Sequence, residues 1–337
     1  MRNPLISPYV AAIFAVLLTA VPASRALADE PGHWVSISDG LLDKLAQQGI
    51  KPGWPGKTAG VAVDRTNGDL YVVVCDQGLW KSTDHGQTFE RVDGGKVGGR
   101  CETGFALDMD ASGGKLMCFM VYGNCAWSAD RGATWTSSRL THLDFGAVDW
   151  GASGKCALTV QHERGGALQM TTDGGQTWKS LGPGFKAVGI FTESALLASK
   201  GDGILRSVDG GASWSKVSDI TPDGLVMQGF NGVGYWTTTR GVLVSRDQGA
   251  TWSILGAPVD AYYGPYFGKN ERSLLVVGKS GLWRTDDAGA TWALGAPLPA
   301  DFKVGFTGPN FAWDPAANVF YASSMGKDTL KYEVPTR

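Results

Sequence analysis

A short motif recurs six times along this chain of 337 residues. Each copy reads Ser/Thr-x-Asp-x-Gly-x-Thr/Ser-Trp/Phe, where x is any residue. The aspartates of the six copies are Asp84, Asp130, Asp173, Asp209, Asp247 and Asp287. Successive copies are 36 to 46 residues apart, so the motif divides most of the chain into units of similar size. A repeat of this length indicates an architecture in which each unit packs on its neighbours.

The motif has the features of a locked hairpin turn. An Asp carboxylate can accept hydrogen bonds from nearby backbone N–H groups, and a Gly two positions later can adopt a positive φ. The aromatic residue that ends the motif begins the next strand and can pack against its own unit or a neighbouring one. Six equivalent carboxylates spread over six units cannot form one site. We therefore assign these aspartates to turns rather than to catalysis or calcium binding.

Each unit contains several short segments with the composition of β-strands. In the first unit they are Gly60–Asp64, Leu70–Val74 and Gly78–Lys81, followed by the motif and a strand from Phe89. The 48 glycines and 13 tryptophans of the chain suit many short strands joined by tight turns. Four short strands in a repeat of about 40 residues are typical of a propeller blade. We therefore predict an all-β propeller.

A seventh unit follows the last motif and has no motif of its own. Its predicted strands are Lys303–Phe306, Phe311–Asp314, Val319–Ala322 and Thr329–Val334. The N-terminal segment His33–Ile37 can supply the missing outer strand, with Trp34 in the place of a motif aromatic. Joining both termini in one blade removes exposed strand edges. We predict a seven-bladed β-propeller whose last blade is closed by the N-terminal strand, with six and eight blades as alternatives.

The motif resembles the Asp box of the bacterial neuraminidase repeat (BNR) superfamily, and the resemblance covers residues 34–334. This superfamily includes sialidases, xyloglucan-active hydrolases, sortilin-type receptors and photosystem II assembly factors. The resemblance implies a propeller with Asp-box hairpins that binds either a glycan or a protein, because one scaffold can host unrelated activities. The Arg-Ile-Pro tripeptide of sialidases does not occur in this sequence.

The first 28 residues have the order of a secretory signal peptide. Arg2 supplies positive charge, the segment Val10–Val21 is apolar, and Ala26–Ala28 is a small-residue cleavage site. The apolar segment is shorter than the roughly 20 residues that span a bilayer, and no later segment is long and apolar enough to insert. We predict cleavage after Ala28 and a single secreted or periplasmic domain at residues 29–337. An uncleaved membrane anchor is the alternative.

The net charge and the cysteines limit which classes of partner and cofactor this chain can have. The formal net charge is −2, so the chain lacks a basic field for nucleic acid. Five cysteines without zinc-ligand spacing leave at least one thiol unpaired. For the others, a local disulfide and a buried apolar role both remain open. We expect a monomer without metal or cofactor.

Ligands of propellers usually bind at the mouth of the central channel. Two sets of loops form the mouth: those that lead into the innermost strands, and those that join the second and third strands of a blade. The binding candidates in these loops are Trp54, Lys57, Arg100, His142, Arg164, Arg240, Tyr262 and Tyr266. The catalytic candidates are Glu102, Asp144, Glu163, Tyr263 and His162. Lysine and arginine are frequent in these loops, which predicts a cationic mouth.

Three functions fit these residues. Sialidase-like hydrolysis of an anionic glycan needs carboxylates beside the scissile bond, or a Tyr–Glu pair with arginines that bind the sugar carboxylate. The tyrosine and arginines of that arrangement are Tyr263, Arg100, Arg164 and Arg240. Elimination from a uronate polysaccharide needs His142 or His162 as base, Tyr263 as acid and an arginine opposite the carboxylate.

The third function is binding without chemistry, on a rigid scaffold for a protein partner or a glycan. Trp54 lies in Lys51-Pro-Gly-Trp-Pro-Gly56, where a large aromatic ring is difficult to bury, and Tyr262–Tyr266 is a second aromatic cluster. Such rings stack on sugars or anchor proteins. We favour binding of a glycan at the mouth, with hydrolysis as its extension, and retain the scaffold and the lyase as alternatives.

Overall fold

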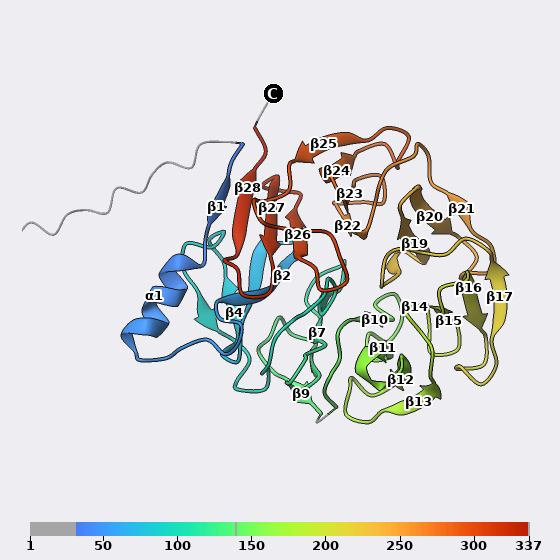
Figure 1. Cartoon of the computed structure of the whole chain (residues 1–337), viewed down its shortest axis with the longest axis horizontal. Helices are drawn as coiled ribbons and strands as arrows, with labels where there is room; N and C mark the ends of the chain where they lie inside the picture. Colours follow the sequence, from blue (N-terminus) through green and yellow to red (C-terminus); the bar gives the residue numbers. More distant parts are fainter. Residues whose placement is uncertain (1–31, 139, 336–337) are drawn as a thin grey trace, which may run out of the picture. The chain divides into compact units, whose positions relative to one another are not determined.

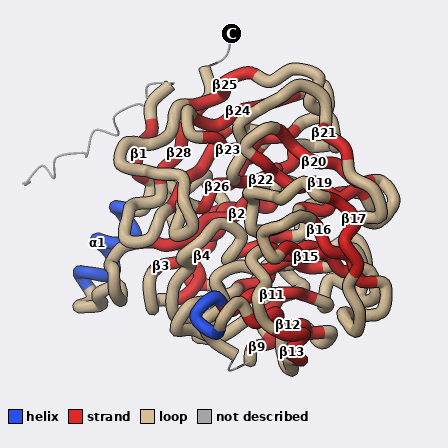
Figure 2. The backbone as a smooth tube through the Cα atoms, turned by 45° about the vertical axis from the view of Figure 1, so that its right-hand side comes forward, coloured by secondary structure: helices blue, strands red, loops and turns tan. Residues whose placement is uncertain are grey.

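The computed structural model describes residues 32–138 and 140–335. These residues form seven four-stranded antiparallel sheets arranged around a common centre (Figure 1), which confirms the predicted seven-bladed β-propeller. Strands and the loops between them account for nearly all of the backbone (Figure 2). The predicted signal peptide, residues 1–28, lies outside the described residues.

The first six blades are simple meanders in chain order. Their innermost strands are β2 (Thr58–Asp64), β6 (Leu107–Met109), β10 (Gly146–Val148), β14 (Ala187–Ile190), β18 (Gln228–Phe230) and β22 (Tyr263–Phe267). The second strands are β3 (Asp69–Val74), β7 (Leu116–Cys118), β11 (Ala157–Gln161), β15 (Leu196–Ser199), β19 (Val233–Thr238) and β23 (Leu274–Gly278). The inner strands are apolar on both faces because each blade is covered by a neighbour on either side.

The outer half of each blade follows the same order. The third strands are β4 (Gly78–Ser82), β8 (Ala126–Ser128), β12 (Ala167–Thr171), β16 (Ile204–Ser207), β20 (Gly241–Ser245) and β24 (Gly281–Thr285). The outer strands are β5 (Glu90–Arg91), β9 (Thr136–Ser137), β13 (Lys179–Gly182), β17 (Ser215–Ser218), β21 (Ser253–Ile254) and β25 (Ala293–Ala296). Several of these outer strands are largely exposed, since no further strand covers them.

Both ends of the chain form the seventh blade, as predicted. It contains β26 (Asn310–Asp314), β27 (Val319–Ser323), β28 (Leu330–Glu333) and β1 (Trp34–Ser36). Strand β1 pairs antiparallel with β28, with Trp34 opposite Tyr332, and the two lie side by side in Figure 1. The Trp34 indole donates to the Pro297 carbonyl of the preceding blade at 2.8 Å, as Trp135 does to Val92 at 2.7 Å. Trp34 therefore takes the place of a motif aromatic.

One predicted strand is wrong. The segment Lys303–Phe306 is a loop that leads into β26. A side chain of the sixth blade holds this loop. The Tyr263 hydroxyl accepts from the Gly305 amide at 2.9 Å and donates to the Gly305 carbonyl at 2.5 Å. The backbone groups of Gly305 are thus bound by a side chain, where a strand would bind a neighbouring strand.

The six motif turns have one hydrogen-bonding pattern. In the first copy the Asp84 carboxylate accepts from the Thr88 amide at 2.9 Å and the Thr88 hydroxyl at 2.6 Å. The Ser82 hydroxyl accepts from the Gly86 amide at 2.8 Å, and Gly86 has a φ of +90°. In another copy, the Thr251 hydroxyl and amide lower the pKa of the Asp247 carboxyl to about 2. These carboxylates are engaged within their own hairpins.

The short helix α1 (Asp39–Gln47) follows β1, where residues 40–48 have a helical composition. Its buried Leu41 and Leu45 pack against Val74 and Trp80 of the first blade. The helix thus covers the outer part of that blade, on the path from the seventh blade into the first.

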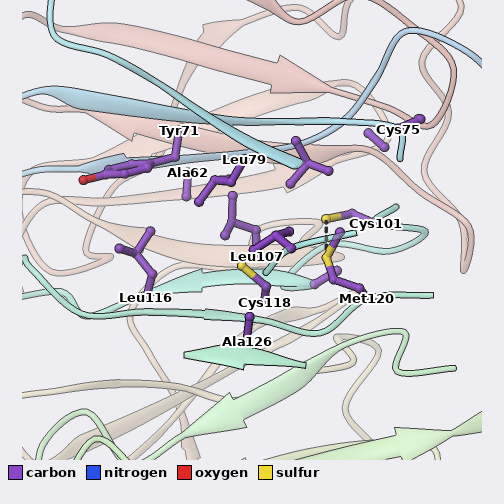
Figure 3. Packing of buried hydrophobic residues seen from close by; sticks show 14 residues of the cluster. Ala62, Tyr71, Cys75, Leu79, Cys101, Leu107, Leu116, Cys118, Met120 and Ala126 are labelled. Carbon is purple, nitrogen blue, oxygen red and sulfur yellow. Dashed lines mark hydrogen bonds between the residues drawn. The ribbon is translucent and has the colours of Figure 1, made fainter. Parts of the chain in front are cut away.

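All five cysteines are buried thiols. Cys75, Cys101 and Cys118 belong to the apolar cluster between the first two blades, shown in Figure 3. Burial raises the pKa of the Cys75 thiol to about 11, which suppresses the reactive thiolate. Within the described residues no disulfide is formed, so the cysteines act as small apolar residues that fill the interface between blades.

Candidate ligand site at the channel mouth

Exposed aromatic side chains gather on the loops that form the mouth. Six large apolar side chains are exposed in the described structure, and three of them are Trp54, Tyr122 and Phe306. Trp54 precedes β2, Tyr122 joins β7 to β8, and Phe306 precedes β26. Single exposed apolar residues are common on any surface, but a group on one face indicates a place of interaction.

Trp54, Arg100 and Tyr122 form what we call the aromatic platform. The Arg100 guanidinium lies 4.6 Å from the centre of the Trp54 ring and 4.6 Å from that of Tyr122. Its Nη2 also lies 2.5 Å from Glu102 Oε1, where both side chains are largely buried. Two cation–π contacts and an ion pair together fix the guanidinium. Trp54 stays 68% exposed and Tyr122 59% exposed, so both rings remain available to a ligand.

A histidine connects the platform to the third blade. The His142 ring meets Tyr122 edge to face, with centroids 4.7 Å apart. His142 Nδ1 lies 2.7 Å from Glu163 Oε2. Glu163 belongs to the short 3-10 helix η1 (His162–Arg164), which joins β11 to β12. The platform therefore has a polar border that can exchange hydrogen bonds with a ligand.

His162 and Asp144 form a second pair beside this border. His162 Nδ1 lies 2.5 Å from Asp144 Oδ2, and the His162 side chain is 41% exposed while that of Asp144 is 1% exposed. Burial raises the pKa of the Asp144 carboxyl, and the hydrogen bond from His162 acts against that rise. Phe306 packs edge to face on the imidazole, with centroids 5.2 Å apart. The carboxylate and Phe306 together hold the orientation of the ring.

A pocket opens beside His162. Its volume is about 590 Å³. Its wall includes the exposed Lys186 and five glycines from the third to fifth blades, which are Gly165, Gly166, Gly184, Gly201 and Gly224. We call it the glycine-lined pocket. Because glycine has no side chain, backbone N–H and C=O groups are accessible along its wall.

Several predicted site residues thus come together at the mouth. Those on the platform, its border and the adjacent pair are Trp54, Arg100, Glu102, His142, Asp144, His162 and Glu163. The cationic mouth is only partly formed, since Arg100 is already paired with Glu102.

The remaining predicted binding residues are not part of the aromatic platform. Lys57 forms an ion pair with Asp328 at 2.6 Å. Arg240 is exposed in the turn between β19 and β20 of the fifth blade, and Arg164 is exposed in η1 of the third. Tyr262, on the sixth blade, packs under the Lys279 ammonium at 5.4 Å. The three arginines of a sialidase-like pocket therefore lie on three different blades.

The tyrosine cluster is built into a strand rather than a loop. Tyr263 and Tyr266 belong to β22, which corrects the prediction that places them in the mouth loops. Tyr263 is 5% exposed, and its hydroxyl is bound to the Gly305 backbone. Tyr266 lines a cavity of about 80 Å³ inside the channel. Both rings pack in the core because the innermost strand must fill the space between its neighbours.

Sequence patterns gave little signal for three residues of the site. Tyr122 and Lys186 are predicted in the mouth loops, but nothing in the sequence distinguishes them there from the other polar residues, and Phe306 lies in a segment that resembles a strand. The acidic residue inside the channel was also missed. Asp108 occupies the position that is Ala62, Ala147 and Ala312 in other blades, two residues before a turn aspartate in each case. Comparison of blades position by position would have found it.

The described residues contain no helix long and apolar enough to cross a membrane. Nor do they hold three or more histidine, cysteine or acidic side chains in an arrangement suited to a metal ion.

Comparison with known proteins finds structural neighbours but no sequence relatives. No protein family description matches the chain, and no curated protein matches it. The β-propeller domain of Cps50 (Swd1) from Myceliophteria thermophila has a TM-score of 0.55 and 10% identity, over 82% of this chain and 97% of that one. This likeness shows the propeller fold alone.

Two further solved structures match more weakly. YCF48 bound to D1 peptide has a TM-score of 0.49 and 14% identity, over 92% of this chain and 99% of that one. An ancestral GH74 enzyme has a TM-score of 0.45 and 13% identity, over 83% of this chain and 45% of that one. The function must therefore be argued from the site itself.

Proposed function

We propose that this chain is an Asp-box propeller that binds a glycan at its channel mouth. The observation that carries the proposal is the aromatic platform, in which Arg100 holds Trp54 and Tyr122 in place while both rings stay exposed. Rigid aromatic rings bind at a low cost in conformational entropy and offer flat faces to the C–H surface of a sugar ring. His142 and Glu163 supply polar groups for sugar hydroxyls at the border.

Binding fits this site better than hydrolysis does. A glycosidase needs one carboxylic acid and one free carboxylate on either side of the scissile bond. Here Glu102, Asp144 and Glu163 are each paired with a cation or an imidazole, at 2.5 to 2.7 Å. The tyrosine of the sialidase-like arrangement, Tyr263, is bound to the backbone of Gly305. Hydrolysis stays a prediction from the sequence, without support from this arrangement.

We expect Trp54→Ala and Tyr122→Ala each to weaken glycan binding about tenfold, or about 1.4 kcal/mol, because each removes one stacking surface. Isothermal titration calorimetry of the purified mature protein, against neutral and uronate-containing oligosaccharides, measures the change. Arg272→Ala is the matched control, since Arg272 is exposed in the turn between β22 and β23, and its affinity should equal that of the wild type.

Two results would overturn this proposal. One is a wild-type protein that binds no member of the glycan panel. The other is glycan binding that survives the double substitution of Trp54 and Tyr122 unchanged. A protein that captures a peptide or protein partner through the platform, but no sugar, would favour the scaffold alternative, because exposed aromatic rings also anchor proteins.

We also propose that the chain is exported and cleaved after Ala28, on the strength of the order of charge, apolar segment and small residues at its N-terminus. Expression of the full chain in a bacterial host should give a periplasmic or secreted product that begins at Asp29. Mass spectrometry of the intact product measures this end. A product that retains residues 1–28 in the membrane fraction would favour the uncleaved anchor instead.

A further inference from the structure

The His162–Asp144 pair has the geometry of an oriented base. Asp144 Oδ2 lies 2.5 Å from His162 Nδ1. When Nδ1 donates its proton to this carboxylate, the lone pair of the neutral imidazole is on Nε2. Asp144 is buried and cannot move aside, whereas the His162 side chain is 41% exposed. The pair therefore presents one fixed proton acceptor to the outside.

The space that His162 faces is suited to an anionic ligand. His162 lines the glycine-lined pocket of about 590 Å³ together with Lys186. The Lys186 ammonium lies across Gly201, whose Cβ, if it had one, would be 2.9 Å from Nζ. Among the described residues no ion pair neutralises Lys186, and a second lysine, Lys200, stacks on the ring of Phe185 in the pocket wall at 4.5 Å. Asp223 also lines this pocket, and its Oδ2 accepts from the Thr239 amide at 2.6 Å, while Lys186 is the cation of the lining. A cation beside an oriented base favours an acid whose C–H bond lies next to its carboxylate.

We propose that the glycine-lined pocket is a catalytic site for β-elimination from a uronate-containing glycan. His162 is the base, Lys186 binds the uronate carboxylate, and Asp144 is a positioning residue that acts through His162. This inference rests on the proposed function, because the glycan reaches the pocket from the aromatic platform. It differs from the elimination expected from the sequence, since Lys186 replaces the arginines and Tyr263 takes no part.

The step balances without any further reactant. His162 Nε2 takes the proton from C5 of the uronate, and the electrons of that C–H bond form the C4=C5 double bond. The C4–O bond breaks, and its electron pair leaves with the departing oxygen. The imidazolium then returns the same proton to that oxygen, as a syn elimination allows. The products are one glycan with a normal end and one with an unsaturated uronate.

Lys186 lowers the barrier because negative charge develops on the carboxylate as the C5 proton leaves. A backbone wall of five glycines leaves room for a polymer to lie along the pocket. Phe306, which packs on the His162 ring at 5.2 Å, keeps the imidazole from turning away while the proton is transferred.

The test is the ultraviolet absorbance of the conjugated C4=C5–carboxylate product, followed with hyaluronan and mannuronate-rich alginate as probes, in which the C5–H and C4–O bonds are syn, and a neutral glycan as blank. We expect His162→Ala to lower kcat at least about 100-fold, since it removes the general base. Asp144→Asn should lower kcat by a similar factor with little change in KM, because it disturbs the orientation of the imidazole alone. Lys186→Met should lower kcat/KM about tenfold or more, through both a lower kcat and a higher KM, because Lys186 binds the carboxylate and stabilises the charge that develops on it.

His33→Ala is the matched control, because His33 is exposed and remote from the pocket in the chain, and it should retain wild-type kcat. A wild-type protein that binds uronate glycans but releases no unsaturated product would overturn the elimination and leave the proposed function intact. Full activity of His162→Ala would also overturn it. Because His162 is partly exposed, this variant tests the base even if Asp144→Asn does not fold. A protein that binds none of these glycans would overturn both proposals.

Discussion

Deleting residues 32–37 from the mature protein should lower the free energy of unfolding by at least about 4 kcal/mol, because the deletion opens the ring. It removes β1, whose Trp34 ring lies 5.3 Å from that of Tyr332 and whose indole is bound to Pro297. It also removes Ile37, which packs on the cluster between the first and seventh blades. Strand β28 is then an unpaired edge, so we also expect soluble aggregates. Thermal denaturation and size-exclusion chromatography measure the two effects.

Two point variants separate ring closure from a general effect of truncation. Trp34→Ala alone should cost about 3 kcal/mol, as expected for the loss of a large aromatic contact. His33→Ala should change the stability by less than about 0.5 kcal/mol, because this neighbouring side chain is exposed. An unchanged melting temperature after the deletion would mean that the first blade and β28 hold the ring closed without β1.

Lowering the pH from about 8 to about 4.5 should stabilise the wild-type protein relative to Asp108→Ala by about 3 kcal/mol. Burial in the channel raises the pKa of the Asp108 carboxyl to about 7, although hydrogen bonds from the Trp150 indole and the Met109 amide act against the rise. Urea denaturation of both proteins at the two pH values measures the difference. Alanine is the appropriate replacement because Ala62, Ala147 and Ala312 occupy this position in other blades.

The direction of this pH effect follows from the number of protons that the folded and unfolded states bind. An aspartate in an unfolded chain titrates near pH ~3.9, so between about pH 4 and 7 the folded protein binds the extra proton at Asp108. The stability that this protonation contributes is present at the lower end of the window and is lost as the pH rises through 7. A wild-type-to-variant difference that stays constant between the two pH values would contradict the prediction.

The motif aspartates respond in the opposite sense and at lower pH. Hydrogen bonds from Thr251 lower the pKa of Asp247 to about 2. The stability from such a group is present above the unfolded pKa and is lost only as the pH falls toward 2. The two kinds of aspartate therefore titrate in separate windows, and the experiment on Asp108 is not disturbed by the turns.

The hairpin turns were predictable because their interactions are local. Ser82, Asp84, Gly86 and Thr88 bind one another within seven residues, so the residue types and their spacing specify the turn. Because the motif needs one continuous hairpin between the third and outer strands of a blade, seven blades carry only six motifs. In the seventh blade the third and outer strands, β28 and β1, come from opposite ends of the chain, and no hairpin exists there to hold a motif.

The misassigned segments depend on distant contacts. Tyr263 was predicted at the mouth and Lys303–Phe306 in a strand, yet the Tyr263 hydroxyl binds the Gly305 backbone across 42 residues. Composition cannot show this contact, because each segment is compatible with either a loop or a strand on its own. The pairing is decided by how two neighbouring blades meet.

The chain's own pattern thus determined the repeat, the turns, the blade count and the closure of the ring. The turns follow from short-range hydrogen bonds, whereas the blade count and the closure follow from the number of strand-like segments and from the N-terminal segment that had no partner of its own. Only the tertiary structure decided which loop residues share a site. Trp54, Arg100 and Tyr122 come from loops of the first two blades, and Asp144 meets His162 across the third. Such contacts depend on how the blades pack around the channel. The loops involved differ from one repeat to the next, so no periodic pattern in the sequence indicates which of them meet.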